Sequence, residues 1–200
     1  MNPISLNDSD ALLVIDMQYD FLPGGSLGVP EGDQVLAPVN ALMAKFAARG
    51  LPVYASRDWH PENHCSFTER GGPWPPHCVA ETRGAAFSDE LLLPADTVII
   101  SKADTVDVDA YSAFNGTALA DHLRHHGIRR VFVCGLATDY CVLNTALDAR
   151  ANGFETVIVP EAMRAVNVQS EDGDRALAQM RAAGATTAAL ADLGEETAAA

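Results

Sequence analysis

The sequence predicts an α/β fold: a doubly wound, mainly parallel sheet of six strands in the order 3-2-1-4-5-6, with helices on both faces. Two observations lead to this prediction. Short apolar runs alternate along the chain with segments of helical periodicity, a pattern typical of parallel sheets. The apolar runs are continuous rather than alternating, which indicates strands buried on both faces. Right-handed crossovers between such strands produce the doubly wound arrangement.

Six segments have the length and composition of buried strands. The first, ALLVID, ends in an acid, and the second, PVYASR, is followed by another acid. The third, TVIIS, is followed at once by a lysine. The predicted strands are 11–16, 52–57, 97–101, 130–134, 155–159 and 185–190.

Four segments with apolar residues about one turn apart are predicted helices. Glycine follows three of them, at Gly50, Gly127 and Gly153, and glycine commonly ends a helix at this position. The predicted helices are 33–49, 117–126, 142–152 and 170–183.

The segments between these elements are rich in glycine and proline, above all residues 58–96. A long irregular segment in a compact domain is usually functional. No repeat or boundary divides the chain, so we expect one domain over 1–200. We expect residues 1–9 and 194–200 to be frayed.

The composition excludes several classes of protein. A formal net charge of −14 argues against nucleic acid and against anionic membrane surfaces, both of which require a basic face. The polar N-terminus does not resemble a signal peptide, and no apolar run approaches membrane length. The four cysteines are too few for a disulfide framework, so we expect a cytoplasmic protein with reduced thiols.

Polar residues stand at the carboxyl ends of four predicted strands. In the order 3-2-1-4-5-6 these ends are neighbours, and ligands of doubly wound folds bind beside them, where the strand order reverses. We therefore expect a site at this edge of the sheet. Its candidate residues are Asp16, Asp58, Lys102 and Cys141.

Cys141 has the position of a nucleophile, in the first turn of a helix that follows a buried strand and a tight turn. A helix N-terminus favours a thiolate, Asp16 could accept the thiol proton, and Lys102 could stabilise the thiolate. Two other interpretations stay open: an inert, buried cysteine, and a structural ion pair between Asp16 and Lys102.

A divalent metal could bind nearby. Asp58 and His60 are two residues apart after a strand, and His77 lies in a later loop; three such ligands leave an open position for water or substrate. His64 is a further candidate, Cys65 and Cys78 are more remote ones, and exposed loop histidines are the alternative interpretation. The helix histidines His122, His125 and His126 are interpreted as solvated.

Three aromatic residues lie in loops, outside the periodic core pattern: Phe21, Trp74 and Tyr111. Their faces could enclose a flat heteroaromatic substrate. Each of them could equally be a hydrophobic anchor for its own loop.

With these segments together, the chain resembles the isochorismatase-like cysteine hydrolases, and among them most closely the nicotinamidases. The resemblance extends from about Ala11 to Leu190. It is carried by the segments VIDMQYDFLPGGSL, SRDWHPENHCSF, GGPWPPHC, SKADTVDVDAYSAF and GLATDYCV.

The resemblance implies a catalytic triad of Asp16, Lys102 and Cys141, and an oxyanion hole formed by the N–H groups of Ala137 and Cys141. It implies a cis peptide before Ala137. Ala103 stands where many relatives have glycine, a difference from which we expect little effect. The family resemblance assigns substrate binding to Phe21, Trp74 and Tyr111. It assigns the metal ligands to Asp58, His60 and His77.

The resemblance further implies hydrolysis of nicotinamide to nicotinate and ammonia in NAD salvage, assisted by one divalent ion. Zinc is the first choice for the ion, with manganese and iron as alternatives. Pyrazinamide is expected as a second substrate, and a homo-oligomer stays open. Two rivals remain: a sister amidase acting on another small amide, and a non-catalytic metal-binding protein with the same fold.

Overall fold

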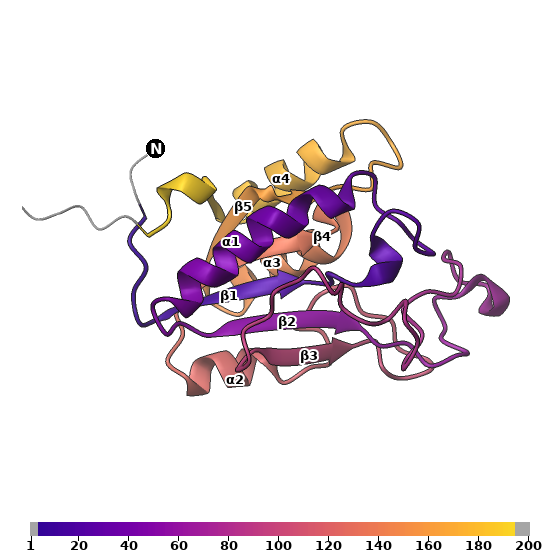
Figure 1. Cartoon of the computed structure of the whole chain (residues 1–200). Coiled ribbons are helices and arrows are strands. Elements are labelled where there is room, and N and C mark those ends of the chain that lie inside the picture. The colour runs from indigo at the N-terminus through magenta and orange to yellow at the C-terminus, as the bar shows by residue number, and fades with distance from the viewer. Residues whose placement is uncertain (1–3, 195–200) are drawn as a thin grey trace, which may run out of the picture.

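The computed structural model describes residues 4–194 of the 200-residue chain. Its six-stranded sheet has the order β3-β2-β1-β4-β5-β6, and every neighbouring pair is parallel (Figure 1). This confirms the predicted fold class and strand order. The strands are β1 (Asp10–Ile15), β2 (Val53–Asp58), β3 (Val98–Lys102), β4 (Arg130–Leu136), β5 (Glu155–Arg164) and β6 (Thr186–Thr187).

Two strands differ clearly from their predicted lengths. β5 continues to Arg164, because an irregularity in β5 between Ile158 and Met163 lets Met163 pair with Gly135 of β4 beyond the apolar run. β6 is only two residues long, whereas six were predicted. It is an edge strand with one partner, and after Thr187 the chain leaves the sheet for a 3₁₀ turn at Leu190–Asp192.

The four predicted helices are present, but each begins later than its periodicity suggests. They are α1 (Leu36–Ala47), α2 (Leu119–His125), α3 (Leu143–Ala151) and α4 (Asp172–Ala182). Tighter or wider turns precede two of them: a 3₁₀ turn at Gly32–Val35 and a π-helical turn at Thr138–Val142. Gly50, Gly127 and Gly153 follow helices with φ of 65°, 71° and 89°, as expected for helix ends.

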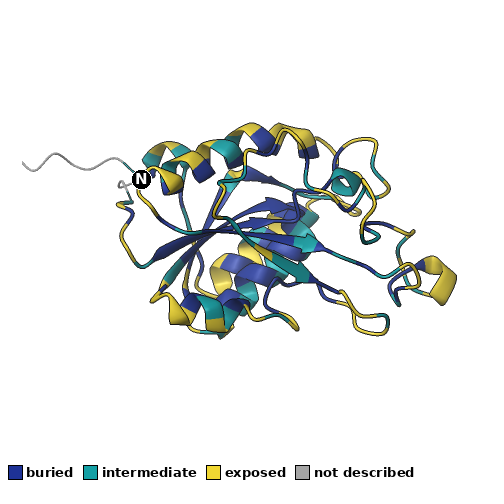
Figure 2. Cartoon of the chain, turned by 60° about the horizontal axis from the view of Figure 1, so that its bottom comes forward, coloured by how far each residue is buried: buried dark blue, intermediate teal, exposed yellow. Residues whose placement is uncertain are grey.

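The alternation of side chains along β1 divides the core into two layers. Leu12 and Val14 pack with α1 on one face, whereas Leu13 and Ile15 pack with α2 and α3 on the other. Figure 2 shows the central strands in the buried colour between helices whose outer surfaces are exposed, whereas the edge strand β3 is mainly intermediate. This packing holds the strand ends in place, and the long loops gather beyond them (Figure 1).

The two terminal segments lie partly outside the described residues, which exclude 1–3 and 195–200. Residues 4–9, expected to be frayed, are hydrogen-bonded: Ile4 N donates to Asp192 O, and Arg129 N donates to Ser9 O. Within residues 4–194, no helix has the length and apolar character needed to cross a membrane.

Candidate active site

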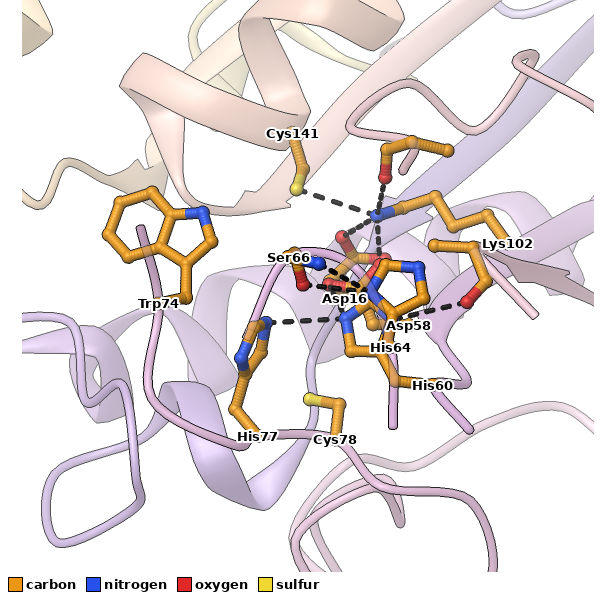
Figure 3. A network of polar contacts seen from close by, with 12 residues as sticks. Asp16, Asp58, His60, His64, Ser66, Trp74, His77, Cys78, Lys102 and Cys141 are labelled. Atoms are coloured by element: carbon orange, nitrogen blue, oxygen red, sulfur yellow. Dashed lines mark hydrogen bonds and ion pairs between the residues drawn. The ribbon is translucent and has the colours of Figure 1, made fainter. Parts of the chain in front are cut away.

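The carboxyl ends of four neighbouring elements bring their polar side chains to one place (Figure 3). Asp16 follows β1, Asp58 ends β2, Lys102 ends β3, and Cys141 lies in the π-helical turn after β4. Asp58 and Lys102 are register partners in the sheet. The convergence that strand order predicts is therefore present.

Lys102 is the centre of this group, and its ammonium is fully buried. Its Nζ lies 3.0 Å from Asp16 Oδ2, 2.5 Å from Asp58 Oδ1 and 3.5 Å from Cys141 Sγ. It also donates to Ala110 O at 3.2 Å. One ammonium thus joins two carboxylates to the thiol.

The two oxygens of Asp16 have different surroundings. Ser56 Oγ donates to Oδ1 at 2.7 Å, and this bond holds the carboxyl group in place. Oδ2 is close to Lys102 Nζ, but the two are poorly aligned for a hydrogen bond, so Oδ2 has no donor among the described residues. Asp16 therefore keeps one oxygen able to accept a proton.

Burial dominates the protonation of this group. It raises the pKa of Asp16, which Lys102 partly counteracts. Burial also raises the pKa of Cys141 well above its usual value, against the lowering effect of Lys102. Burial lowers the pKa of Lys102, but Asp16 and Asp58 outweigh it, so this pKa is raised. Cys141 therefore rests as a thiol, not as the thiolate that the helix N-terminus suggested.

Three of the seven non-glycine residues with left-handed backbone in the described part of the chain lie at or beside the site. Asp16, Cys78 and Ala103 have φ of 49°, 44° and 51°, an uncommon conformation for residues other than glycine. Cys78 directly follows His77, and Ala103 directly follows Lys102. Such outliers cluster at functional sites, where surrounding contacts hold them.

Asp58, His60 and His77 form a second, adjoining group whose side chains are all buried (Figure 3). Their candidate ligand atoms all lie within 4.8 Å of one another. His60 Nδ1 faces Ala103 O at 3.1 Å and His77 Nδ1 faces Pro75 O at 2.8 Å, so each Nδ1 carries the hydrogen. Both Nε2 lone pairs are then free, and the two atoms lie 3.3 Å apart.

This arrangement fits a divalent cation. Burial, and then the neighbouring His77 and His64, lower the pKa of His60 to about 3, and burial lowers the pKa of His77 as well. Both rings are therefore neutral, as metal ligands must be. Carbonyl acceptors that fix the outer ring nitrogen are typical of metal-binding histidines.

The other candidate ligands are placed differently. His64 is buried and stacks on His60, but its Nδ1 faces Ser66 Oγ at 2.8 Å and its Nε2 faces Val108 O at 3.0 Å, so both nitrogens are engaged. Cys65 and Cys78 lie outside the three-residue group. The alternative of exposed loop histidines fails for His60 and His64, which are both buried.

The helix histidines match their interpretation only in part. His125, the last residue of α2, and His126, which directly follows it, are exposed, as expected. His122 is half-buried, and its Nδ1 lies 3.1 Å from Tyr54 Oη. That contact joins α2 to β2, which the spacing of histidines along one helix could not indicate.

A cavity of about 300 Å³ opens onto both groups. All three predicted loop aromatics line it, together with Asp58, His77, Ala137 and Cys141. Trp74 Nε1 donates to Tyr111 Oη at 2.9 Å, and the Phe21 ring lies 5.8 Å from that of His77. The peptide between Leu136 and Ala137 is cis, as the family resemblance implied.

Sequence reasoning missed two residues of this region. Tyr140 lines the cavity with its ring 5.3 Å from that of Trp74, although its place beside Cys141 was a signal. Gln18 is buried and holds the backbone of Asp58 in place. Its Oε1 accepts a hydrogen bond from Asp58 N and its Nε2 donates one to Asp58 O, both at 2.8 Å. A glutamine two positions after Asp16 was the available signal.

Comparison with known proteins agrees with this geometry. The isochorismatase domain matches residues 10–192. The chain belongs to the isochorismatase family. Among curated members of that family, the nicotinamidase of Escherichia coli K12 is 42% identical over an alignment of 206 positions, which covers 92% of this chain and 97% of the relative.

Solved structures of the family are also similar. The pyrazinamidase of Pyrococcus horikoshii, in complex with zinc, is 51% identical, with a TM-score of 0.87 over 90% of this chain and 99% of that one. The PnC1 protein of L. infantum, in complex with nicotinate, is 40% identical, with a TM-score of 0.90 over 97% and 100%. The family resemblance seen in the sequence is therefore confirmed.

Proposed function

We propose that this member of the isochorismatase family is a metal-assisted cysteine amidohydrolase, which converts nicotinamide to nicotinate and ammonia and also accepts pyrazinamide. The observation that carries the proposal is the contact of one buried ammonium, that of Lys102, with both Asp16 and Cys141 beside a cavity. The nicotinamidase and pyrazinamidase relatives support the substrate class. The product nicotinate would enter NAD salvage.

In this proposal Asp58, His60 and His77 hold one divalent ion, and the ion is zinc. The buried carboxylate and two neutral imidazoles suit zinc, and the pyrazinamidase relative was solved with it. When bound, the ion supplies a fixed Lewis-acidic point beside the cavity for the pyridine nitrogen. Elemental analysis of the purified protein separates zinc from manganese and iron.

The chemistry belongs to the three residues around Lys102. Asp16 takes the proton of the Cys141 thiol through its free Oδ2, while Lys102 stabilises the thiolate. The sulfur forms a bond to the amide carbon, and the C–N bond then breaks. Asp16 returns the proton to the departing nitrogen, which leaves as ammonia. Water, deprotonated by Asp16, cleaves the thioester, and the thiol recovers its proton.

The backbone and the cavity walls complete the assignment. The N–H groups of Ala137 and Cys141 hold the oxyanion. Phe21, Trp74 and Tyr111 hold the planar ring, which the apolar walls of the cavity suit. Raised pKa values of Asp16 and Cys141 support direct transfer of a proton between them rather than a standing thiolate.

The test is ammonia release from nicotinamide, by metal-loaded protein and after treatment with a chelator. We expect turnover that the chelator removes and added zinc restores. Release from other small amides but not from nicotinamide would instead favour the sister amidase. No release from any amide would favour a non-catalytic metal-binding protein.

A further inference from the structure

Asp20 is a polar residue beside the cavity to which the reaction scheme gives no task. It lies in a 3₁₀ turn, Tyr19–Phe21, in the loop that follows β1, and next to the proposed ring-binding residue Phe21. Its side chain is half-buried and makes no ion pair with any described residue. A carboxylate in this position needs other partners, and both of its oxygens have one.

The two oxygens of Asp20 accept backbone hydrogen bonds from two different segments. Ser26 N donates to Oδ1 at 3.2 Å, and Cys78 N donates to Oδ2 at 2.7 Å. In addition, Leu27 N donates to the main-chain oxygen of Asp20 at 2.9 Å. Asp20 thus joins the segment 26–27 to Cys78.

The two joined segments have different tasks in the cavity. Ser26 and Leu27 line it on the side of Phe21, yet Ser26 is exposed and Leu27 only half-buried, so little packing holds them. Cys78 follows the proposed metal ligand His77 and has a left-handed backbone, which a firm hydrogen bond to its N–H helps to hold. The Asp20 carboxylate therefore connects one wall of the cavity, at Phe21, Ser26 and Leu27, to the segment that carries the proposed metal ligand His77.

Gly84 shows how closely the chain fits around this carboxylate. Asp20 N donates to Gly84 O at 3.0 Å. A Cβ built on Gly84 would meet Asp20 Oδ2 at 2.1 Å and Asp20 Cγ at 2.4 Å. Any side chain at position 84 would push the Asp20 carboxylate away from Cys78 N. Changes at Asp20 and at Gly84 therefore affect the same hydrogen bond, the one between Asp20 Oδ2 and Cys78 N.

We propose that Asp20 is a positioning residue for the proposed reaction: it sets the place of the ring wall at Phe21, Ser26 and Leu27 relative to the metal ligand His77. A substrate whose ring contacts the wall and whose ring nitrogen binds the ion depends on the position of the wall relative to His77. A ligand that needs only the wall depends on it much less. The inference rests on the proposed nicotinamidase function, because it concerns how the ring nitrogen is presented to the ion.

The experiment compares Asp20→Ala, Asp20→Asn and Gly84→Ala with the wild type. Alanine removes both acceptors, asparagine retains one, and Gly84→Ala displaces the carboxylate without removing it. The matched control is Glu161→Gln, because Glu161 also accepts a backbone N–H, from Leu190, but does not line the cavity. Two variants that act on one contact from opposite sides keep the test valid if one of them folds poorly.

We expect the KM for nicotinamide to rise about tenfold in Asp20→Ala and Gly84→Ala, and about threefold in Asp20→Asn. The inhibition constant of benzamide, which has the ring but no ring nitrogen, should change less than about threefold. The alkylation rate of Cys141 should stay within about twofold of wild type, because the triad is not touched. Glu161→Gln should match the wild type in all three measurements.

A merely structural role has a different signature: a smaller active fraction lowers kcat and leaves KM and the inhibition constant unchanged. That result would overturn the proposal, as would equal weakening of nicotinamide and benzamide. Zinc titration tests Asp20 without turnover, since Asp20→Ala should weaken zinc binding about tenfold and Glu161→Gln should not. Unchanged zinc affinity would also overturn the proposal, whereas absence of wild-type turnover would refute only the proposed function.

Discussion

Asp58 Oδ1 lies 2.5 Å from Lys102 Nζ, while Asp58 Oδ2 lies 3.7 Å from His60 Nε2. One carboxylate therefore belongs to both the metal group and the group around the thiol. A change at Asp58 would disturb both at once.

Cys141→Ala is expected to lower turnover at least about 10³-fold, because the thioester can no longer form. The matched control is Cys134→Ala, which removes a buried core thiol whose one hydrogen bond among the described residues is donated to Leu13 O. It should keep turnover and lose some stability, since it leaves a small cavity in the core. Equal turnover of Cys141→Ala and wild type would remove Cys141 from the nucleophile role.

Asp16→Asn should separate reactivity of the thiol from catalysis. Turnover should fall about 10²- to 10⁴-fold, because the proton acceptor and donor is lost. The negative charge of Asp16 raises the pKa of Cys141, so its removal should lower that pKa. Alkylation of the thiol by iodoacetamide at neutral pH should therefore become faster. Slower alkylation together with lost turnover would point to a structural role for Asp16.

Lys102→Gln should have the opposite effect on the thiol. The ammonium lowers the pKa of Cys141, so its loss should raise that pKa and move alkylation to higher pH. Turnover should fall as well, because the thiolate loses its counter-charge. An alkylation profile that coincides with the wild type would show that Lys102 only holds Asp16 and Asp58 together.

His60→Ala and His77→Ala are each expected to lose the bound ion, because three protein ligands become two. His64→Ala is the matched control: its ring stacks on His60, but its nitrogens face Ser66 and Val108. It should keep the ion and lose some stability. Metal content per chain, measured by elemental analysis, decides the matter, and a full complement in His60→Ala and His77→Ala would refute the ligand assignment.

Nicotinamide and benzamide should differ strongly as substrates. Benzamide fits the aromatic walls of the cavity but lacks the ring nitrogen that the ion is proposed to bind. Sites built around a polar contact reject analogues without it by about 10⁴-fold in favourable cases. The measurement is kcat/KM for both amides in metal-loaded protein. A difference below about tenfold, or 1.4 kcal/mol, would favour the sister amidase.

The sequence alone indicated the fold and most of the candidate site. Continuous apolar runs, helical periodicity and terminal glycines are local signals, and together with general topology rules they indicated a doubly wound parallel sheet, for which the order 3-2-1-4-5-6 was assumed. That order brought Asp16, Asp58, Lys102 and Cys141 to one edge of the sheet. The metal and ring residues needed the family resemblance in addition, because spacing alone left exposed loop histidines and hydrophobic anchors as alternatives.

Only the tertiary structure decided the chemical state of these residues, because protonation depends on burial and on charges brought from distant segments. Burial makes Cys141 a resting thiol, although its place near a helix start suggested a thiolate. Contacts with Ser66 and Val108 engage both nitrogens of His64, which spacing could not show. The hydrogen bonds that join Ser26 to Cys78 through Asp20 connect segments about fifty residues apart. These features arise from long-range packing, for which the local sequence carries no signal.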